Sequence, residues 1–158
     1  MREIKFRGKC LDNGEWVSGF VLFSQDKSEA VIAKLTATES VCENVDPATV
    51  GQFTGLHDKN GKEIYEGDVL HIKQYENNGY RIFGADISFP NCFTIDECKG
   101  ELLREGNALV YFTEGCMCVG GMFISALFGD MRYSFPLFEF EIIGNIHDNP
   151  ELIKEDQK

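Results

Sequence analysis

Polar and apolar residues alternate along the opening of the chain, with the period of a half-buried β-strand. From Arg2 to Cys10, the apolar residues Ile4 and Phe6 fall on one side, and the charged residues Glu3 and Lys5 fall on the other. The pattern predicts a strand with one face in a core and a charged face in water.

Further segments with strand character recur between turn signals. They are Ala30–Leu35, Val69–Tyr75, Tyr80–Phe89, Asn107–Phe112, Cys116–Phe123 and Phe138–Ile146. One more, Trp16–Phe23, is apolar on both sides except at Ser18 and Gly19. We expect that strand to be covered on both faces or to lie at an interface, because a strand with one wet face alternates instead.

Short polar segments predict tight turns. Asp12-Asn13-Gly14 is one of them. Asp58–Gly61 is expected to form a primed turn, since Asn tolerates a positive φ and Gly has no Cβ to clash. Gly67-Asp68 then precedes a β-branched segment, where Gly permits a sharp bend and Asp can bond to nearby amides.

The sequence predicts a short helical turn at two positions, because a residue that can cap a helix is followed there by proline. Asp46-Pro47 opens the first and Asn149-Pro150 opens the second. Thr94–Arg104 is ambiguous, since its apolar spacing suits a helix while Gly100 opposes one.

These elements together predict a mainly β fold. We expect a small SH3-like barrel over about residues 52–146 with one or two short helices. Residues 1–45 would form an N-terminal β-strand layer, and residues 46–158 a barrel-like part with a short C-terminal helix. The two parts are expected to pack as one compact unit. The structure of residues 75–106 does not follow from the sequence pattern.

The stretch Gln52–Leu70, QFTGLHDKNGKEIYEGDVL, contains a tight turn, charged residues on both sides of it and the start of a strand. With Val50-Gly51 before it, this stretch resembles the signature of the YopX family of phage and prophage proteins. The opening MREIKFRGK and the closing EIIGNIHDNPEL resemble the two ends of that family. The resemblance implies a small, mainly β protein carried on phage or prophage genomes, with no established activity and no catalytic motif to transfer.

The balance of charge restricts the partners. Among 158 residues, 15 are basic and 26 acidic, for a net charge of −11. This charge repels phosphate backbones and disfavours nucleic acid as a partner. One local basic cluster, formed by Arg2, Lys5, Arg7 and Lys9, is the exception.

No apolar segment approaches the length of a membrane span, and no signal peptide is visible. We therefore expect a protein of the bacterial host cytoplasm, without a membrane partner. In that reducing compartment the six cysteines are expected to be free thiols.

Four cysteines are the candidate metal ligands. Cys92 and Cys98 have five residues between them, and Cys116 and Cys118 flank a single methionine, as two zinc thiolates on a strand might. Structural zinc sites favour cysteine pairs separated by about two to four residues, and this sequence meets that spacing only loosely. Alternating cysteines in a hairpin are more often small core residues. We therefore expect no cofactor, with zinc as the alternative.

Nucleophilic catalysis needs a thiolate beside a base and an orienting group. No spacing pairs a cysteine with the candidate bases His57, His71 or His147. Two carboxylate pairs also occur, Glu139 with Glu141 and Glu66 with Asp68. The first pair is expected on the outer face of a strand, and the second supplies too few ligands to hold a cation firmly.

Three functions remain open. The sequence favours a non-enzymatic phage accessory protein that acts through protein contacts or self-association, because it is acidic, rich in aromatic residues and without a catalytic constellation. The first alternative is a metal-binding or thiol-dependent enzyme near Cys116 and Cys118. The second is a nucleic-acid-binding module that uses the basic face of the first strand.

Overall fold

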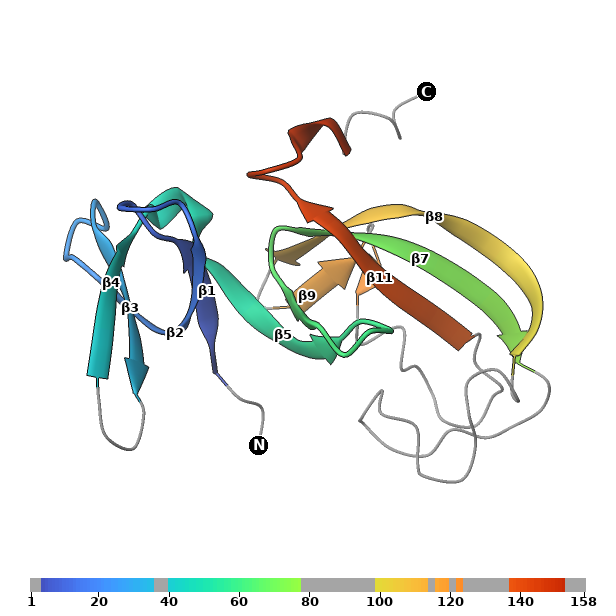
Figure 1. Cartoon of the computed structure of the whole chain (residues 1–158). Coiled ribbons are helices and arrows are strands. Elements are labelled where there is room, and N and C mark those ends of the chain that lie inside the picture. Colours follow the sequence, from blue (N-terminus) through green and yellow to red (C-terminus); the bar gives the residue numbers. More distant parts are fainter. Residues whose placement is uncertain are drawn as a thin grey trace. The chain divides into compact units, whose positions relative to one another are not determined.

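The computed structural model of the chain describes residues 4–35, 40–77, 99–113, 116–119, 122–123 and 137–152 (Figure 1). Strands dominate this part, so the prediction of a mainly β protein is confirmed. The chain forms two compact units, Met1–Gly55 and Leu56–Lys158. The predicted boundary between residues 45 and 46 stays a prediction.

The described strands form two antiparallel sheets. The strands are β1 (Phe6–Lys9), β2 (Trp16–Phe23), β3 (Ala30–Leu35), β4 (Ser40–Val45), β5 (Gly51–His57), β6 (Glu63–Tyr65), β7 (Asp68–Asn77), β8 (Lys99–Thr113), β9 (Cys116–Val119), β10 (Met122–Phe123) and β11 (Leu137–Asn145). One sheet has the order β4-β3-β2-β1-β5-β6 and the other the order β10-β9-β8-β7-β11. Neither order returns to its first strand, so the SH3-like barrel over residues 52–146 stays a prediction.

Strand β2 divides its pairing between two neighbours. Its first half, Trp16–Gly19, pairs with β1, and its second half, Phe20–Phe23, pairs with β3. The change falls at Gly19, where a Cβ would lie 2.3 Å from the carbonyl oxygen of Ala33. Glycine is required because the backbone of β3 approaches too closely for any side chain.

The core of the first unit is formed mainly by residues of β1 to β4. Ala30, Ile32 and Val45 are buried at its centre. Four partly buried residues pack against them: Phe6, Val17, Val21 and Val50. Gly8 lies against the same core, since a Cβ there would be 2.8 Å from Cγ2 of Val45. The alternation predicted for the first strand is thus confirmed at Phe6 and Gly8.

The end of β4 returns to the end of β1 through one isolated antiparallel bridge between Cys10 and Val45. The Leu11 N–H donates to the Asn44 carbonyl, and the Asp46 N–H donates to the Lys9 carbonyl, each over 2.9 Å. The sheet of the first unit therefore curls upon itself without a continuous closing ladder.

The second unit is built around β7, which pairs with β8 on one side and β11 on the other. Its buried core consists of Ile64, Leu70, Val110 and Phe140. The rings of Phe138 and Phe140 stack with centroids 6.1 Å apart. Burying each large apolar side chain stabilises the unit by roughly 1.5–3 kcal/mol before the entropy of ordering is counted.

The expectation that β2 is covered on both faces by this chain is wrong. Val17 and Val21 pack on the core, but Phe20 and Leu22 are 56% and 62% exposed. Successive residues of a strand face opposite sides, so the apolar residues of the second side remain in water. The other expectation for this strand, that it lies at an interface, stays a prediction.

Several strand boundaries differ from the sequence pattern. Lys99–Arg104, the part of the ambiguous segment that the structure describes, belongs to β8, because pairing with β7 overrides the helical spacing. Strand β4 was not foreseen, because Ser40–Val45 is a largely exposed edge without firm alternation. Cys116–Phe123 is split between β9 and β10. The predicted strand Tyr80–Phe89 lies outside the described residues.

The predicted helical turns are present. A 3-10 turn spans Pro47–Thr49, and the Asp46 carboxylate accepts from the Ala48 N–H over 2.9 Å as its cap. A second 3-10 turn covers residues 150–152. The turn at residues 12–14 is also confirmed, with Gly14 at φ 72°.

Candidate functional site

The turn after β5 is held together by one carboxylate. Oδ1 of Asp58 accepts from the N–H groups of Asn60 and Lys62 over 2.8 and 2.9 Å. Gly61 has φ 78°, but Asn60 does not have a positive φ. The prediction of a primed turn is therefore wrong. The Gly61 N–H donates to the Asp58 carbonyl, which gives a longer turn with one left-handed residue.

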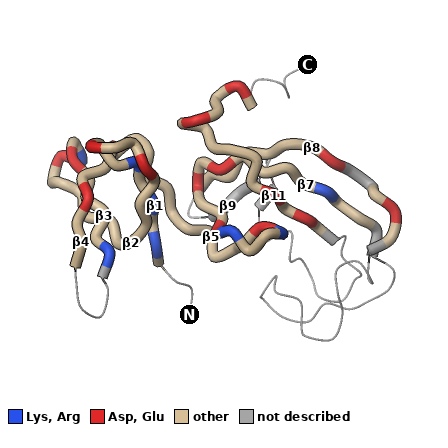
Figure 2. The backbone as a smooth tube through the Cα atoms, in the orientation of Figure 1, with Lys and Arg blue, Asp and Glu red and all other residues tan. Residues whose placement is uncertain are grey.

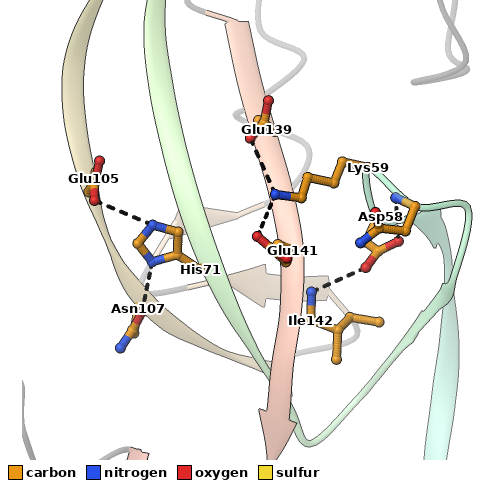
Figure 3. Close-up of polar contacts among 9 residues, drawn as sticks. Asp58, Lys59, His71, Glu105, Asn107, Glu139, Glu141 and Ile142 are labelled. Carbon is orange, nitrogen blue, oxygen red and sulfur yellow. Dashed lines mark hydrogen bonds and ion pairs between the residues drawn. The ribbon is translucent and has the colours of Figure 1, made fainter.

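This turn lies against the outer edge of β11. The Lys59 N–H donates to the Phe140 carbonyl over 2.8 Å, and the Ile142 N–H donates to Oδ2 of Asp58 over 3.3 Å (Figure 3). An uncovered edge strand presents unpaired backbone groups that can recruit another chain. The turn satisfies two such groups, so its residues have a structural role that the sequence pattern did not reveal.

The side chain of Lys59 extends from the same turn over β11. Its Nζ contacts the carboxylate of Glu141 and lies 3.9 Å from that of Glu139 (Figure 3). The hydrogen bond to Glu141 is the main cause of a raised pKa of Lys59. The carboxylate pair of β11 thus neutralises a lysine on the outer face, in agreement with its predicted position.

Asp58 itself is buried. Burial is the largest effect on the pKa of Asp58 and raises it, but the bonds from the N–H groups of Lys62, Ile142 and Asn60 together outweigh burial and lower the pKa. The carboxylate is therefore held in its ionised form as an acceptor, which suits a structural clamp and not a proton-transfer group.

Gly67 and Asp68 connect the same motif to the strands of the second unit. Gly67 has φ 86°, its N–H donates to the Val110 carbonyl, and its own carbonyl accepts from the Ile146 N–H. Oδ2 of the buried Asp68 accepts from the Tyr65 N–H over 2.8 Å. The predicted bend and amide bond are confirmed, and this carboxylate is committed to the backbone.

His71 of β7 contacts two residues of β8. Its Nδ1 lies 3.0 Å from Oδ1 of Asn107, and its Nε2 lies 3.5 Å from Oε1 of Glu105 (Figure 3). The contact with Glu105 is an ion pair only when the imidazole is protonated. Both ring nitrogens of His71 thus contact side chains of β8. The interpretation of His71 as a structural histidine fits this geometry.

Two of the four predicted metal ligands lie on a described strand. Cys116 and Cys118 lie on β9, paired in register with Thr113 and Tyr111 of β8. Cys92 and Cys98 lie outside the described residues. A zinc site at these four cysteines stays a prediction.

A different group of possible ligands is found in the first unit. Sγ of the buried Cys10 and carboxylate oxygens of Asp12 and Glu43 all lie within 4.8 Å of one another. Sγ of Cys10 is 3.8 Å from Oε2 of Glu43. Sequence reasoning missed this group, because Glu43 reaches Cys10 only through the curl of the sheet. No spacing in the sequence signals that contact.

The basic cluster of the first strand is partly used by the fold. The guanidinium of Arg7 lies over the ring of Trp16, with Cζ 4.6 Å from the ring centroid. The backbone N–H of Lys9, and not its ammonium group, donates to Oγ1 of Thr49. In the described part of the chain, Asp and Glu positions are spread along both units (Figure 2), and nucleic-acid binding through the basic cluster stays a prediction.

Exposed apolar side chains gather on the first unit. We call Phe20 and Leu22 of β2 the apolar face. In register, they pair with Ala33 and Val31 of β3. Phe20 and Leu22 are more than half exposed, which is unusual for adjacent large apolar residues of one strand face. This face is a candidate binding surface.

In the described part of the chain, no helix is long and apolar enough to span a membrane.

Comparisons with known proteins find matches that cover nearly the whole chain. The family model described as "YopX protein" matches residues 5–154. No curated protein matches the chain. Among solved structures, the chain is similar to the crystal structure of protein EF1440 from Enterococcus faecalis, with 20% sequence identity and a TM-score of 0.49. That similarity covers 97% of this chain and 99% of the other.

Proposed function

Because the chain belongs to the YopX family, we propose that it is a phage or prophage accessory protein that acts through protein–protein contacts in the cytoplasm of the bacterial host. The phage setting follows from what the family resemblance implies. The observation that carries the contact role is the apolar face, since Phe20 and Leu22 are 56% and 62% exposed. Adjacent exposed apolar residues favour association with another protein surface.

The chemistry of the described residues supports a contact role over catalysis. Asp58 and Asp68 are committed to backbone N–H groups, and His71 contacts an amide and a carboxylate. The carboxylates of β11 share the Lys59 ammonium. Each of these candidate polar groups thus contacts another group of the same chain, and that contact gives it a structural role.

The apolar face is tested by a paired substitution. Phe20→Ser with Leu22→Ser removes the apolar contact, and Ile143→Ser in the second unit is the matched control because Ile143 is also exposed, at 38%. Host proteins are captured on the immobilised chain, identified by mass spectrometry and then purified for binding measurements. Light scattering reports self-association.

We expect one partner, or a second copy, to bind the native chain and the Ile143→Ser control equally. The paired variant should bind at least about tenfold more weakly, because two large apolar contacts are lost. A strict monomer without any partner contradicts the proposal. A partner that binds the paired variant as tightly as the native chain contradicts the assignment of the face.

Metal binding at Cys92, Cys98, Cys116 and Cys118 is the alternative proposal. The alternation of Cys116 and Cys118 supports it, and elemental analysis of the purified protein tests it. Zinc in a one-to-one ratio, lost when Cys116 and Cys118 are both changed to serine, is the supporting result. Zinc-free protein with those serine variants fully folded counts against it.

A further inference from the structure

Strand β4 is the last strand of its sheet. In a regular antiparallel ladder, successive residues direct both backbone groups alternately toward and away from a given neighbour. The carbonyl of Asn44 points away from β3, because it accepts from the Leu11 N–H. By the same alternation, Ser40 and Cys42 also direct their N–H and C=O groups away from β3. Among the described residues, no strand pairs with these groups.

Two carboxylates stand where this open edge ends. Oxygens of Asp12 and Glu43 lie within 4.8 Å of each other, beside Sγ of Cys10. Like charges at this separation repel, and a cationic group between them relieves the repulsion. Glu43 shares a face of β4 with Val41, because the two residues are two positions apart. Val41 is 43% exposed.

We propose that the edge of β4 from Ser40 to Glu43 binds an extended segment of a partner protein by strand addition. The segment carries a basic residue opposite Glu43 and an apolar residue opposite Val41. Lys34 of β3 pairs with Val41 from the other side, which disfavours a second positive charge at that position. Strand addition supplies affinity through backbone hydrogen bonds and specificity through alternate side chains. This inference rests on the proposed role in protein contacts and names the chemistry of the partner.

A second copy of the chain fits the edge less well. Pairing of two copies through Ser40 and Cys42 places Val41 opposite Val41, and it places the Glu43 residues of both copies on one face of the joined sheet. Like charges on one face repel each other, and Ser40–Glu43 contains no basic residue that would neutralise them. A basic segment turns the same positions into opposite-charge pairs, so charge complementarity selects a partner other than this chain.

The probe is a fluorescein-labelled peptide, acetyl-Thr-Lys-Thr-Val-Thr-Lys-Thr-amide, whose central valine would face Val41. A matched peptide replaces its third and fifth residues with proline. The charge is unchanged, but the two N–H groups that would bond to Ser40 and Cys42 are removed. Fluorescence anisotropy of the full chain should show at least about tenfold weaker binding of the proline peptide.

Two protein variants locate the binding. Cys42→Pro removes the outward N–H without removing a bond to β3, and Cys42→Ala is its control. Glu43→Lys should bind the lysine peptide at least about tenfold more weakly and a glutamate version of the peptide more tightly. Amide chemical shifts of the native chain should move at Ser40–Glu43 and Asp12, which tests the site even if Cys42→Pro does not fold.

Equal affinity for the threonine and proline peptides, absence of binding, or shifts confined to other strands would overturn the inference. A dimer in light scattering that Cys42→Pro dissociates would assign the edge to a second copy instead, and would also overturn it. If the peptide does not bind but a partner is still captured through the apolar face, only this inference is removed. Absence of any partner removes the proposed function as well.

Discussion

Single carboxylates and glycines set the geometry of this protein at the residue scale. Asp58 bonds to three backbone N–H groups from two segments that lie far apart in the sequence. Its neighbour Lys59 adds an ion pair on the outer face. Sequence reasoning located this turn, but it could not show that the carboxylate reaches Ile142, since that bond depends on the tertiary position of β11.

Replacing Asp58 with alanine tests this clamp. The change leaves three N–H groups without their acceptor, so we expect the free energy of unfolding to fall by roughly 1–3 kcal/mol. Asp26→Ala is the control, because Asp26 caps only an exposed loop through Ser24 and Ser28. Urea denaturation of both variants measures the difference. Equal stability of the two variants would show that the bonds of Asp58 do not matter.

The same carboxylate predicts a dependence of stability on pH. Folding lowers the pKa of Asp58, so at a given acidic pH the Asp58 side chain binds fewer protons in the folded chain than in the unfolded chain. Its stabilisation is complete well above the unfolded value of about 3.9 and is lost as the pH falls through the folded value. The difference in unfolding free energy between the native chain and Asp58→Asn should therefore shrink from pH 7 toward pH 3. A difference that stays constant over this range contradicts the prediction.

At the scale of the element, pairing partners decide what the sequence pattern leaves open. Period two located β1 and β11, because each has one face in a core. The same reasoning missed β4, whose residues are mostly exposed, and it could not assign Lys99–Arg104 to β8. In these strands, the hydrogen-bonded neighbour and not the side-chain pattern imposes the conformation. The candidate group of Cys10, Asp12 and Glu43 escaped prediction for the same reason.

Gly19 and Gly106 provide a matched test of close strand approach. A Cβ at Gly19 would lie 2.3 Å from a backbone oxygen, whereas a Cβ at Gly106 would meet nothing within 4 Å. Gly19→Ala should lower the free energy of unfolding by roughly 1–3 kcal/mol through overpacking. Gly106→Ala should be neutral or slightly stabilising, because alanine has less entropy to lose than glycine. Thermal unfolding of both variants measures the difference, and the reverse order would refute the close approach of β3 at Gly19.

At the scale of the whole molecule, the chain has two cores and two compact units. The mainly β class followed from the sequence, because alternation and turn residues act locally. The division after Gly55 did not follow from the sequence, because the chain continues across it as the single strand β5 (Gly51–His57). The family resemblance in the sequence rests on three separated segments, which carry no information on how the cores divide.

The two cores predict separable effects of mutation. Ile32 and Ile64 are both 1% exposed, one in each core. Changing either to alanine should cost roughly 2–5 kcal/mol in its own unit by leaving a cavity. Hydrogen exchange should show faster exchange mainly in strands of the altered unit. Equal loss of protection in both units for both variants would show that they unfold as one.

The turn that lies along β11 also limits where the chain can be lengthened. Two hydrogen bonds to the backbone of β11, one from the Lys59 N–H and one to the Asp58 carboxylate, fix its size. An inserted peptide would move one of these groups out of reach of β11. The exposed loop from Ser24 to Glu29 bonds mainly to itself. An epitope tag or a fluorescent label for locating the protein in cells therefore belongs in that loop.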